Sequence, residues 1–330
     1  MTTSQYSSVL VERPFVTRRL FRKLLVAACI LLITLGALEV AVRVWGYSER
    51  HIYDPIYTAF DRTGDIPYVH KPNLERARAR GLAVINTDSL GLRAKIAGAS
   101  YGAKQPNEFR IALVGDSFTF GEGVARTEDT FVQVLEDSLN QGQQAVTVKA
   151  LNFGASAYSV KEMAATLQYR MVDIQPDLVV MAIIPSDFNL ARTPVIDESG
   201  YLIDQRLSYW SPSGSMALQM VRGIHLTYVL RDIGVRWFFK RPDVGQVLAG
   251  GEIPETYTYV RQFKTTAEQR GVPYVIMLLP RVQQGTWGRV PDQLTRDNIT
   301  HIDLSFLGNE FTEEQYMASR FDPHPSPAVH

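Results

Sequence analysis

Side chains that together make an activated nucleophile occur at two distant places in this sequence. Ser117 follows Gly115 and Asp116, and Asp322 and His324 lie two residues apart near the other end of the chain. A serine hydroxyl is a poor nucleophile until a base takes its proton, and an imidazole base needs a carboxylate to orient it. All three parts are present, so the sequence predicts acyl-transfer chemistry. The alternative for the first stretch is an Asp or Ser that only caps a helix.

The residues around Ser117 predict the elements that would position it. Four apolar residues, Ile111 to Val114, are typical of a strand buried on both faces, and a turn of small residues follows. Helical spacing of apolar residues begins near Glu128. Ser117 should therefore lie at the carboxyl end of a strand, where open α/β sheets carry their chemistry. Gly121 and Gly123 are expected to keep the next segment of backbone loose.

The rest of the chain continues as strands that alternate with helices. Strands are expected at 146–150, 178–184 and 274–279, and helices at 160–171 and 257–270. Strands separated by helices of this length imply parallel β-α-β units with helices on both faces. The expected fold class is therefore a three-layer α/β/α domain around a central, mostly parallel sheet, flavodoxin-like in arrangement.

The amino-terminal part of the chain predicts a membrane anchor. The segment 24–42 is apolar except for Thr34, Gly36 and Glu39, and at 1.5 Å per residue it would reach about 28 Å, close to the thickness of a bilayer's hydrocarbon core. Basic residues gather before it, which predicts a cytoplasmic start and an extracytoplasmic remainder. A cleaved signal peptide, a lipoprotein signal at Cys29 and a buried core helix are the alternatives. We expect a single-pass protein of the inner or plasma membrane with a periplasmic domain.

Composition limits the function classes. The 330 residues carry equal numbers of acidic and basic side chains, so no global basic field would recruit nucleic acid. A single cysteine excludes an intramolecular disulfide framework, and no Cys/His cluster has the spacing of a zinc site. We expect neither a metal nor an organic cofactor. The expected segments are a basic tail (1–23), the membrane helix (24–42), a connector (43–106) and a catalytic domain (107–330).

A helical insertion is expected within the catalytic domain, at about 190–251. Its run 216–239 has apolar residues at helical spacing, and His225 falls on that face. We interpret this face as helix core and His225 as a packed core histidine.

Together, the two ends of the catalytic segment resemble the SGNH/GDSL hydrolase family. The first block of that family reads Gly-Asp-Ser, and its last block reads Asp-x(1–2)-His-Pro, as in Asp322-Pro-His324-Pro. The resemblance covers about two thirds of the chain, from Arg110 to His330, and it implies the SGNH fold. The stretch from Asn86 to Arg93 also looks like a segment that leads into membrane-anchored members, although it could equally be a hairpin or loop covering a sheet edge.

The resemblance implies a role for each matching residue. Ser117 would be the nucleophile, His324 the general base and Asp322 the acid that orients it. The oxyanion hole would use the backbone N–H of Ser117 and that of Gly154, which matches the glycine of the second block. Glycine suits a position where a ligand oxygen approaches the backbone closely, although an ordinary strand-to-helix turn would also explain it.

The third block departs from the family pattern. The family has Gly-x-Asn-Asp there, and its Asn amide donates to the oxyanion, whereas this sequence has Pro-Ser186-Asp187-Phe-Asn189. Ser186 falls on the Asn position. The serine side chain is shorter than that of Asn, and its hydroxyl can rotate away from the oxyanion. Asn189 would fill the gap if the loop bends inward. Loss of one well-placed donor costs roughly 10²–10³ in rate.

Two functions from different classes follow. The first is a serine esterase that acts on an extracytoplasmic ester, such as the O-acetyl groups of a glycan or lipid, by hydrolysis or by transfer to a sugar hydroxyl. The second is a catalytically weakened binding or assembly subunit in envelope polysaccharide modification, which the serine at position 186 favours. The partners expected are a small acyl ester or acylated glycan and the membrane.

Overall fold

The computed structural model describes most of the chain. The described residues are 16–47, 51–60, 64–80, 83–142, 145–190, 194–203, 220–221, 223–238, 248, 252–280 and 287–330.

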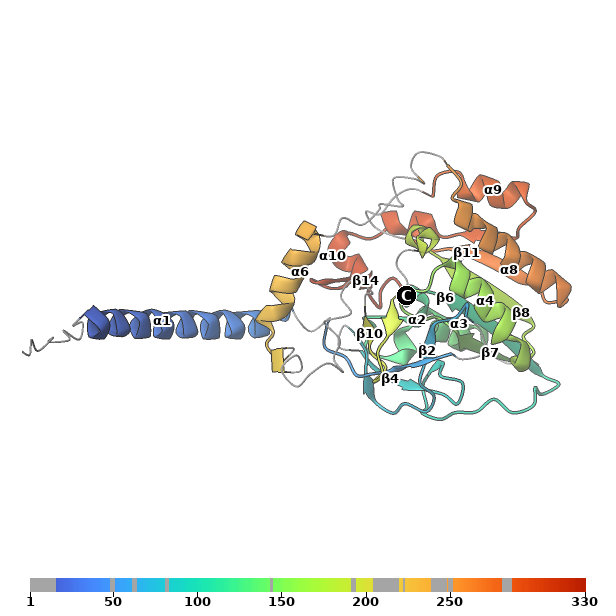
Figure 1. Ribbon diagram of the computed structural model, residues 1–330. Coiled ribbons are helices and arrows are strands. Elements are labelled where there is room, and N and C mark those ends of the chain that lie inside the picture. The colour runs from blue at the N-terminus through green and yellow to red at the C-terminus, as the bar shows by residue number, and fades with distance from the viewer. Residues whose placement is uncertain are drawn as a thin grey trace, which may run out of the picture.

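A five-stranded parallel sheet lies at the centre of the domain, with strand order β12-β11-β8-β6-β7 (Figure 1). Its register pairs Gly115 with Ala182 and Leu113 with Asn152, so β6, β7 and β8 end at the same edge. The parallel sheet and its flanking helices confirm the expected fold class. The strands are β6 (Glu108–Gly115), β7 (Thr147–Asn152), β8 (Leu178–Ile183), β11 (Tyr274–Leu278) and β12 (His301–Asp303).

Alternation along β6 explains the three layers. Ile111 and Leu113 pack with Val132 of α3 (Phe131–Leu139) on one face of the sheet. Ala112 and Val114 belong to a separate cluster, the main core, on the other face, because successive side chains of a strand point to opposite faces. That core includes residues of α4 (Val160–Tyr169) and α8 (Thr258–Gln269), which contact each other. A continuous apolar run is what a strand covered on both faces requires.

The connector is more ordered than its mixed composition suggested. It forms two small antiparallel sheets, and the first of them contacts the chain that follows edge strand β7. There, the hydroxyl groups of Tyr57 and Tyr68 donate to the hydroxyl and the carbonyl oxygen of Ser156. The connector strands are β1 (Tyr57–Ala59), β2 (Tyr68–His70), β3 (Ala77–Arg78), β4 (Val84–Thr87) and β5 (Arg93–Ala94).

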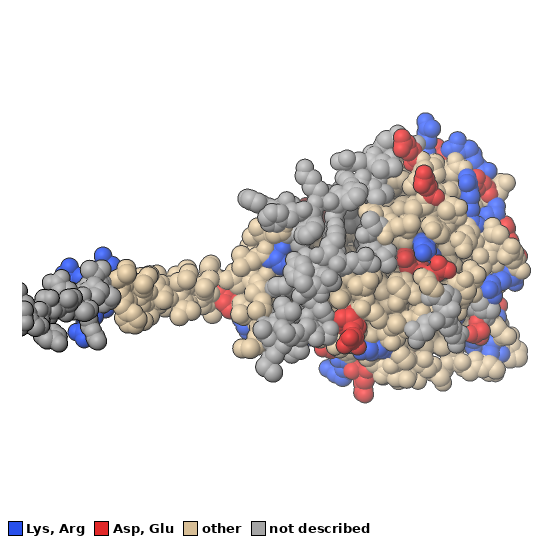
Figure 2. All heavy atoms as spheres, in the orientation of Figure 1, with Lys and Arg blue, Asp and Glu red and all other residues tan. Residues whose placement is uncertain are grey.

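The amino-terminal helix α1 (Val16–Trp45) projects away from the domain (Figure 1). Its residues Arg18–Trp45 form the one helix in the described part of the chain that is long and apolar enough to cross a membrane. Figure 2 shows a length of this helix without charged side chains, between basic residues at its start and the domain. Its carboxyl end meets α6 (Leu226–Phe238), which Figure 1 shows crossing it.

The structure describes only part of the expected insertion. Residues 204–219, which include the start of the expected helix, lie outside the described residues. His225 is not a packed core histidine: it is partly exposed and lies in the turn that precedes α6. A short hairpin of β9 (Val195–Ile196) and β10 (Leu202–Ile203) occupies the start of the insertion.

The last described elements are a short helix and a hairpin. The helix is α10 (Glu313–Tyr316), and the hairpin consists of β13 (Met317–Ser319) and β14 (Asp322–Pro325). β14 contacts α2 (Ser117–Phe120), the single helical turn after β6. This contact brings the two ends of the catalytic segment together.

Candidate active site

Ser117 lies at the first position of α2, directly beyond the carboxyl end of β6. Asp116 is the N-cap of this turn, and its side chain accepts a hydrogen bond from the backbone N–H of Phe118 at 2.9 Å. The capping role that was the alternative for Asp116 or Ser117 therefore falls to Asp116. Gly115 has no space for a Cβ, which would lie 2.0 Å from Thr119 Oγ1 and 2.6 Å from the carbonyl oxygen of Ala182. Glycine is thus required for α2 to turn tightly over the sheet.

The structure brings Ser117 together with Asp322 and His324. The Nε2 atom of His324 lies 3.0 Å from Ser117 Oγ, although 207 residues separate them. The Nδ1 atom lies 2.5 Å from Asp322 Oδ1, so the carboxylate fixes the orientation of the ring. Burial acts to raise the pKa of Asp322, but the hydrogen bonds and charge of His324, together with the charge of Arg80, outweigh it and lower that pKa. The carboxyl group is therefore held as an acceptor for the imidazole.

The glycines after α2 make the segment tight, not loose as the sequence suggested. Gly121 is the left-handed C-cap of the turn, with φ of +79°. Gly123, with φ of +86°, lies against the hairpin that carries the acid. A Cβ at Gly123 would lie 2.7 Å from Ala318 Cβ and 3.1 Å from Asp322 Oδ2. The glycine therefore permits β14 to approach α2 closely enough for the three side chains to meet.

A second carboxylate lies beside the imidazole, and sequence reasoning missed it. Glu122 is 2% exposed, and its Oε2 lies 3.7 Å from His324 Nε2. The hydroxyl of Ser156 donates to the same oxygen at 2.7 Å, and Arg80 Nε lies 3.5 Å from Oε1. No motif marks Glu122. The only signal was an acidic residue between two glycines in a segment expected to be near the nucleophile.

These acidic groups raise the pKa of His324 above its ordinary value. Burial acts to lower the pKa, but the charge of Glu122, the hydrogen bond and charge of Asp322 and the charge of Asp116 together outweigh it. A carboxylate faces each ring nitrogen, so the protonated imidazole is favoured on both sides. This arrangement stabilises the imidazolium that forms when the base takes a proton from the serine.

Arg93, in strand β5 of the connector, holds the nucleophile turn α2 in place. Its buried guanidinium donates to the carbonyl oxygens of Gly121 at 2.6 Å and Val124 at 2.7 Å, and to that of Phe120 at 3.2 Å. Burial lowers the pKa of Arg93 to about 10, although the charges of Glu128 and Asp129 act to raise it. A carbonyl group at the end of a helical turn has no partner within the turn, so Arg93 satisfies groups that burial would otherwise leave unpaired.

Gly154 is placed close to α2, but its N–H already has a partner. The N–H donates to the side-chain oxygen of Asn152 at 3.0 Å, and the amide of Asn152 donates in turn to the carbonyl of Thr119 at 2.8 Å. A Cβ at Gly154 would lie 2.4 Å from the backbone nitrogen of Phe120. Close packing on α2 therefore accounts for the glycine, and its role as an oxyanion donor stays a prediction.

The third block forms a 3₁₀ turn, Pro185–Phe188, just beyond the end of β8. Because β8 is the neighbour of β6, the turn lies at the same edge of the sheet as Ser117. Asp187 is buried and accepts from the N–H of Ile184 at 2.8 Å, which fixes the turn. Ser186 and Asn189 are both partly exposed, and the backbone N–H of Asn189 donates to the carbonyl of Ser186. Which side chain serves the oxyanion stays a prediction.

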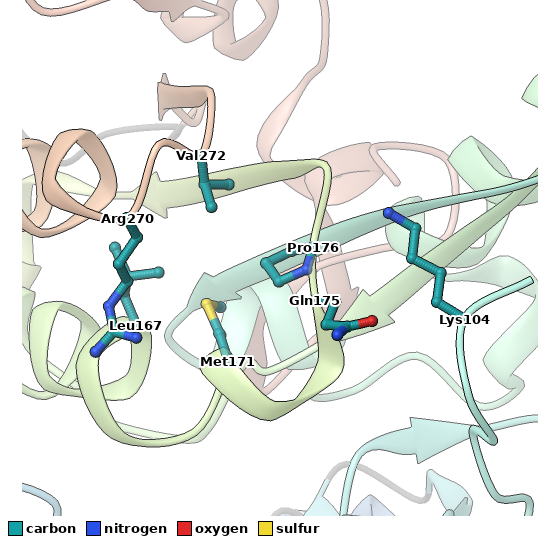
Figure 3. A pocket seen from close by; sticks show the side chains of 7 residues that line it. All are labelled: Lys104, Leu167, Met171, Gln175, Pro176, Arg270 and Val272. Carbon is teal, nitrogen blue, oxygen red and sulfur yellow. The ribbon is translucent and has the colours of Figure 1, made fainter. Parts of the chain in front are cut away.

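Two other features do not add to the site. Among the described residues, no group of three or more His, Cys, Asp or Glu side chains could hold a metal ion. A cavity of about 550 Å³ is lined by residues that precede β6, β8 and β11, including Lys104, Pro176 and Val272 (Figure 3). It is therefore at the amino ends of the strands, at the opposite edge of the sheet from Ser117. Lys104 is paired with Asp177 there.

Fold and geometry together define a three-layer α/β protein with a serine, a histidine and an aspartate joined at the carboxyl end of its sheet. No protein-family model matches this sequence, and no curated protein sequence matches it. Solved structures similar to this chain are GDSL and SGNH hydrolases, the family that its motifs resemble.

Three of these structures give the scale of the similarity. A GDSL-like lipase from Bacteroides thetaiotaomicron is 10% identical, with a TM-score of 0.37 over 69% of this chain and 85% of that chain. An SGNH-hydrolase family esterase is 14% identical, with a TM-score of 0.33 over 62% of this chain and 77% of that one. A two-domain esterase active on acetylated mannans is 10% identical, with a TM-score of 0.38 over 67% of this chain and 46% of that chain.

Proposed function

We propose that this protein is a serine esterase with Ser117 as nucleophile, His324 as general base and Asp322 as the residue that orients the base. The observation that carries the proposal is the chain of two short contacts, 3.0 Å from Ser117 to His324 and 2.5 Å from His324 to Asp322. The same hydrogen-bond geometry activates serine in unrelated folds, so it is recognised by the roles of its members and not by their order.

The geometry supports a two-step acyl transfer. Ser117 Oγ attacks the ester carbonyl carbon while His324 Nε2 takes its proton, and Asp322 and Glu122 stabilise the resulting imidazolium. Collapse of the tetrahedral intermediate passes that proton to the leaving alcohol and leaves an acyl group on Ser117. Water, or the hydroxyl of an acceptor, then attacks the acyl carbon while it gives its proton to His324. His324 returns that proton to Ser117 Oγ as the bond between Ser117 and the acyl group breaks, which restores the free serine. The backbone N–H of Ser117 is a donor for the oxyanion, because the first N–H groups of a helical turn have no partner within the turn.

The surroundings of Ser117 favour a small acyl group. Ser117 is buried, and Phe118 packs beside it with Ile184, Leu279 and Tyr316 in one apolar cluster. Such apolar packing beside the nucleophile would suit a small acyl group and would limit the water around the developing charge. An acetyl ester of a glycan or lipid fits this description.

The proposal includes a location. The helix α1 is taken as an uncleaved anchor that crosses the membrane once, with residues 1–23 in the cytoplasm and the domain outside. Its support is the apolar length of the helix and the basic residues at its start. The substrate would then be an extracytoplasmic ester close to the membrane.

A fluorophosphonate probe tests the chemistry directly, because it labels a serine only when a base activates it. We expect labelling of Ser117 and hydrolysis of p-nitrophenyl acetate, both lost in Ser117→Ala. Ser138→Ala, which changes an exposed serine on α3, is the matched control and should keep both. Substantial hydrolysis by Ser117→Ala, at an unchanged melting temperature, would show that the nucleophile is elsewhere.

The second candidate function is a binding or assembly subunit with a weakened site. The observations that favour it are the serine at position 186 and the hydrogen bond that engages the N–H of Gly154. If the folded protein is neither labelled nor active toward acetyl esters, but binds an acetylated glycan, this second function replaces the first.

A further inference from the structure

The junction between α1 and α6 is built from polar contacts at the level of the last apolar turn of α1. The carboxylate of Glu39 accepts the backbone N–H groups of His225 at 2.9 Å and Leu226 at 2.7 Å, so it caps the start of α6. Arg43, one turn further along α1, donates to Glu39 at 2.7 Å and to the carbonyl of Gly223 at 3.0 Å. The start of α6 is therefore held at the depth of Glu39, about 9 Å along the helix axis before Trp45.

One face of α6 is directed toward the domain. Tyr228 is buried and stacks on the ring of His51, with ring centroids 5.2 Å apart. Asp232, one turn later, accepts from the hydroxyl of Tyr47 at 2.9 Å and lies 3.1 Å from His51 Nε2. Tyr228 and Asp232 thus lie on the inner face of the helix.

The opposite face of α6 is apolar and exposed. At 100° per residue, Leu226, Leu230 and Ile233 fall on the side opposite Tyr228 and Asp232. Leu230 is 60% exposed and Ile233 is 49% exposed, while Leu226 is partly exposed. This is the reverse of a helix on a soluble protein, which directs its apolar face to the core and its charges to water. A contiguous apolar face of this kind marks a contact with another apolar phase.

We propose that α6 is an interfacial helix whose outer face, formed by Leu226, Leu230 and Ile233, lies in the surface of the lipid bilayer that α1 crosses. The proposal rests on the membrane anchor of the proposed function and goes beyond it, because an anchor alone leaves the orientation of the domain open. The junction between α1 and α6 indicates that lipid covers this face. A bilayer that covers the apolar length of α1 ends near Val42, within about 5 Å of Glu39, and α6 starts there and crosses α1 (Figure 1).

The same junction reaches the hairpin that carries the catalytic acid and base. Trp45, the last residue of α1, makes an edge-on contact with Phe321, with ring centroids 5.1 Å apart. Phe321 directly precedes Asp322, and His324 follows on β14. An interfacial α6 would therefore hold the active site at a fixed height over the lipid surface, so that the substrate is an ester presented at that surface.

The test uses the full chain in phosphatidylcholine vesicles, with the single native cysteine replaced (Cys29→Ala) and one new cysteine carrying an environment-sensitive fluorophore. Three positions are compared: Leu230 on the outer face of α6, Leu31 in the middle of α1, and Leu139, a 42% exposed leucine on α3 that serves as the matched control. Nitroxide-labelled lipids then report depth, with the spin label either near the headgroup or near the end of the acyl chain.

We expect the headgroup-level nitroxide to quench the probe at Leu230 at least about twofold more than the probe at Leu139, and the deep nitroxide to quench the probe at Leu31. If Leu31 is quenched while Leu230 behaves like Leu139, α1 spans the membrane but α6 does not lie on it, and the inference is overturned. If Leu31 is not quenched, the anchor itself is wrong and the inference falls with it. A double change, Leu226→Asp with Ile233→Asp, made in the variant that carries the probe at position 230, should abolish the difference in lipid contact while leaving hydrolysis of a soluble acetyl ester unchanged.

Discussion

Replacing Gly123 by alanine should separate the cost of a strained backbone from the cost of displacing the catalytic acid. Gly123 has φ of +86°, and its new Cβ would lie 2.7 Å from Ala318 Cβ and 3.1 Å from Asp322 Oδ2, where ordinary contact begins at 3.4 Å. Gly142 is the matched control, because its φ is +83° and nothing lies within 4 Å of the Cβ position.

Both substitutions place an alanine in a left-handed backbone conformation, which should lower the free energy of unfolding by about 1–2 kcal/mol each. For a domain of this size, each kcal/mol lowers the melting temperature by roughly 2–4 °C. Only Gly123→Ala must also push the β13–β14 hairpin away by several tenths of an ångström, because Asp322 and Ala318 occupy the space. A misplacement of about 1 Å costs roughly a hundredfold in rate, so we expect kcat/KM to fall about ten- to a hundredfold.

The assay is p-nitrophenyl acetate hydrolysis, together with the rate of fluorophosphonate labelling, at a temperature where both variants remain folded. Gly142→Ala should match the wild-type rate, while Gly123→Ala should fall in both measurements. Equal rates in the two variants would refute the reasoning, because they would mean that close packing at Gly123 does not hold Asp322 in place.

Three further predictions address other parts of the site. Activity should rise with pH as His324 loses its proton, with a midpoint above the ordinary 6.5. Glu122→Gln should move this limb of the pH–rate profile to lower pH, because it removes a charge that raises the pKa of His324. An unmoved limb would contradict the interaction between Glu122 and His324. Arg93→Met should lower the free energy of unfolding by about 3 kcal/mol in chemical denaturation, because it removes charged donors to buried carbonyl oxygens, and a stability within error of wild type would exclude that role. Ser186→Asn should raise kcat about tenfold and Ser186→Ala should lower it by a similar factor, with little change in KM; if instead Asn189→Ala alone collapses kcat, Asn189 is the oxyanion donor.

The core of the fold could be predicted from the sequence because its pattern is local. The continuous apolar run of β6 indicated burial on both faces, and the helical spacing of α4 and α8 indicated the layers that cover it. The proximity of Ser117 to His324 needed more than periodicity, since 207 residues separate them, and only the paired motifs suggested it.

The features that the sequence did not predict depend on contacts that form only in the folded chain. The periodicity of α6 indicated an apolar stripe, which we interpreted as helix core, yet Leu230 is exposed. Glu122 could not be identified either, because its importance comes from Ser156 and His324, which approach it only in the folded chain. Likewise, Gly123 was expected to loosen the backbone, whereas its missing Cβ permits a close contact. The sequence shows an apolar stripe or a glycine, but only the tertiary contacts show what packs against it.

The wide separation of Ser117 from Asp322 and His324 also affects the biosynthesis of the protein. The ribosome makes α1 first and the nucleophile turn next, and it adds the acid and base about 200 residues later. At ordinary rates of translation this interval lasts roughly 10–40 s. During that time a nascent chain would carry the serine without its base, so it would be unable to attack esters. The proposed esterase would therefore become active only after the hairpin had been added and had packed on α2, which confines its chemistry to the folded domain.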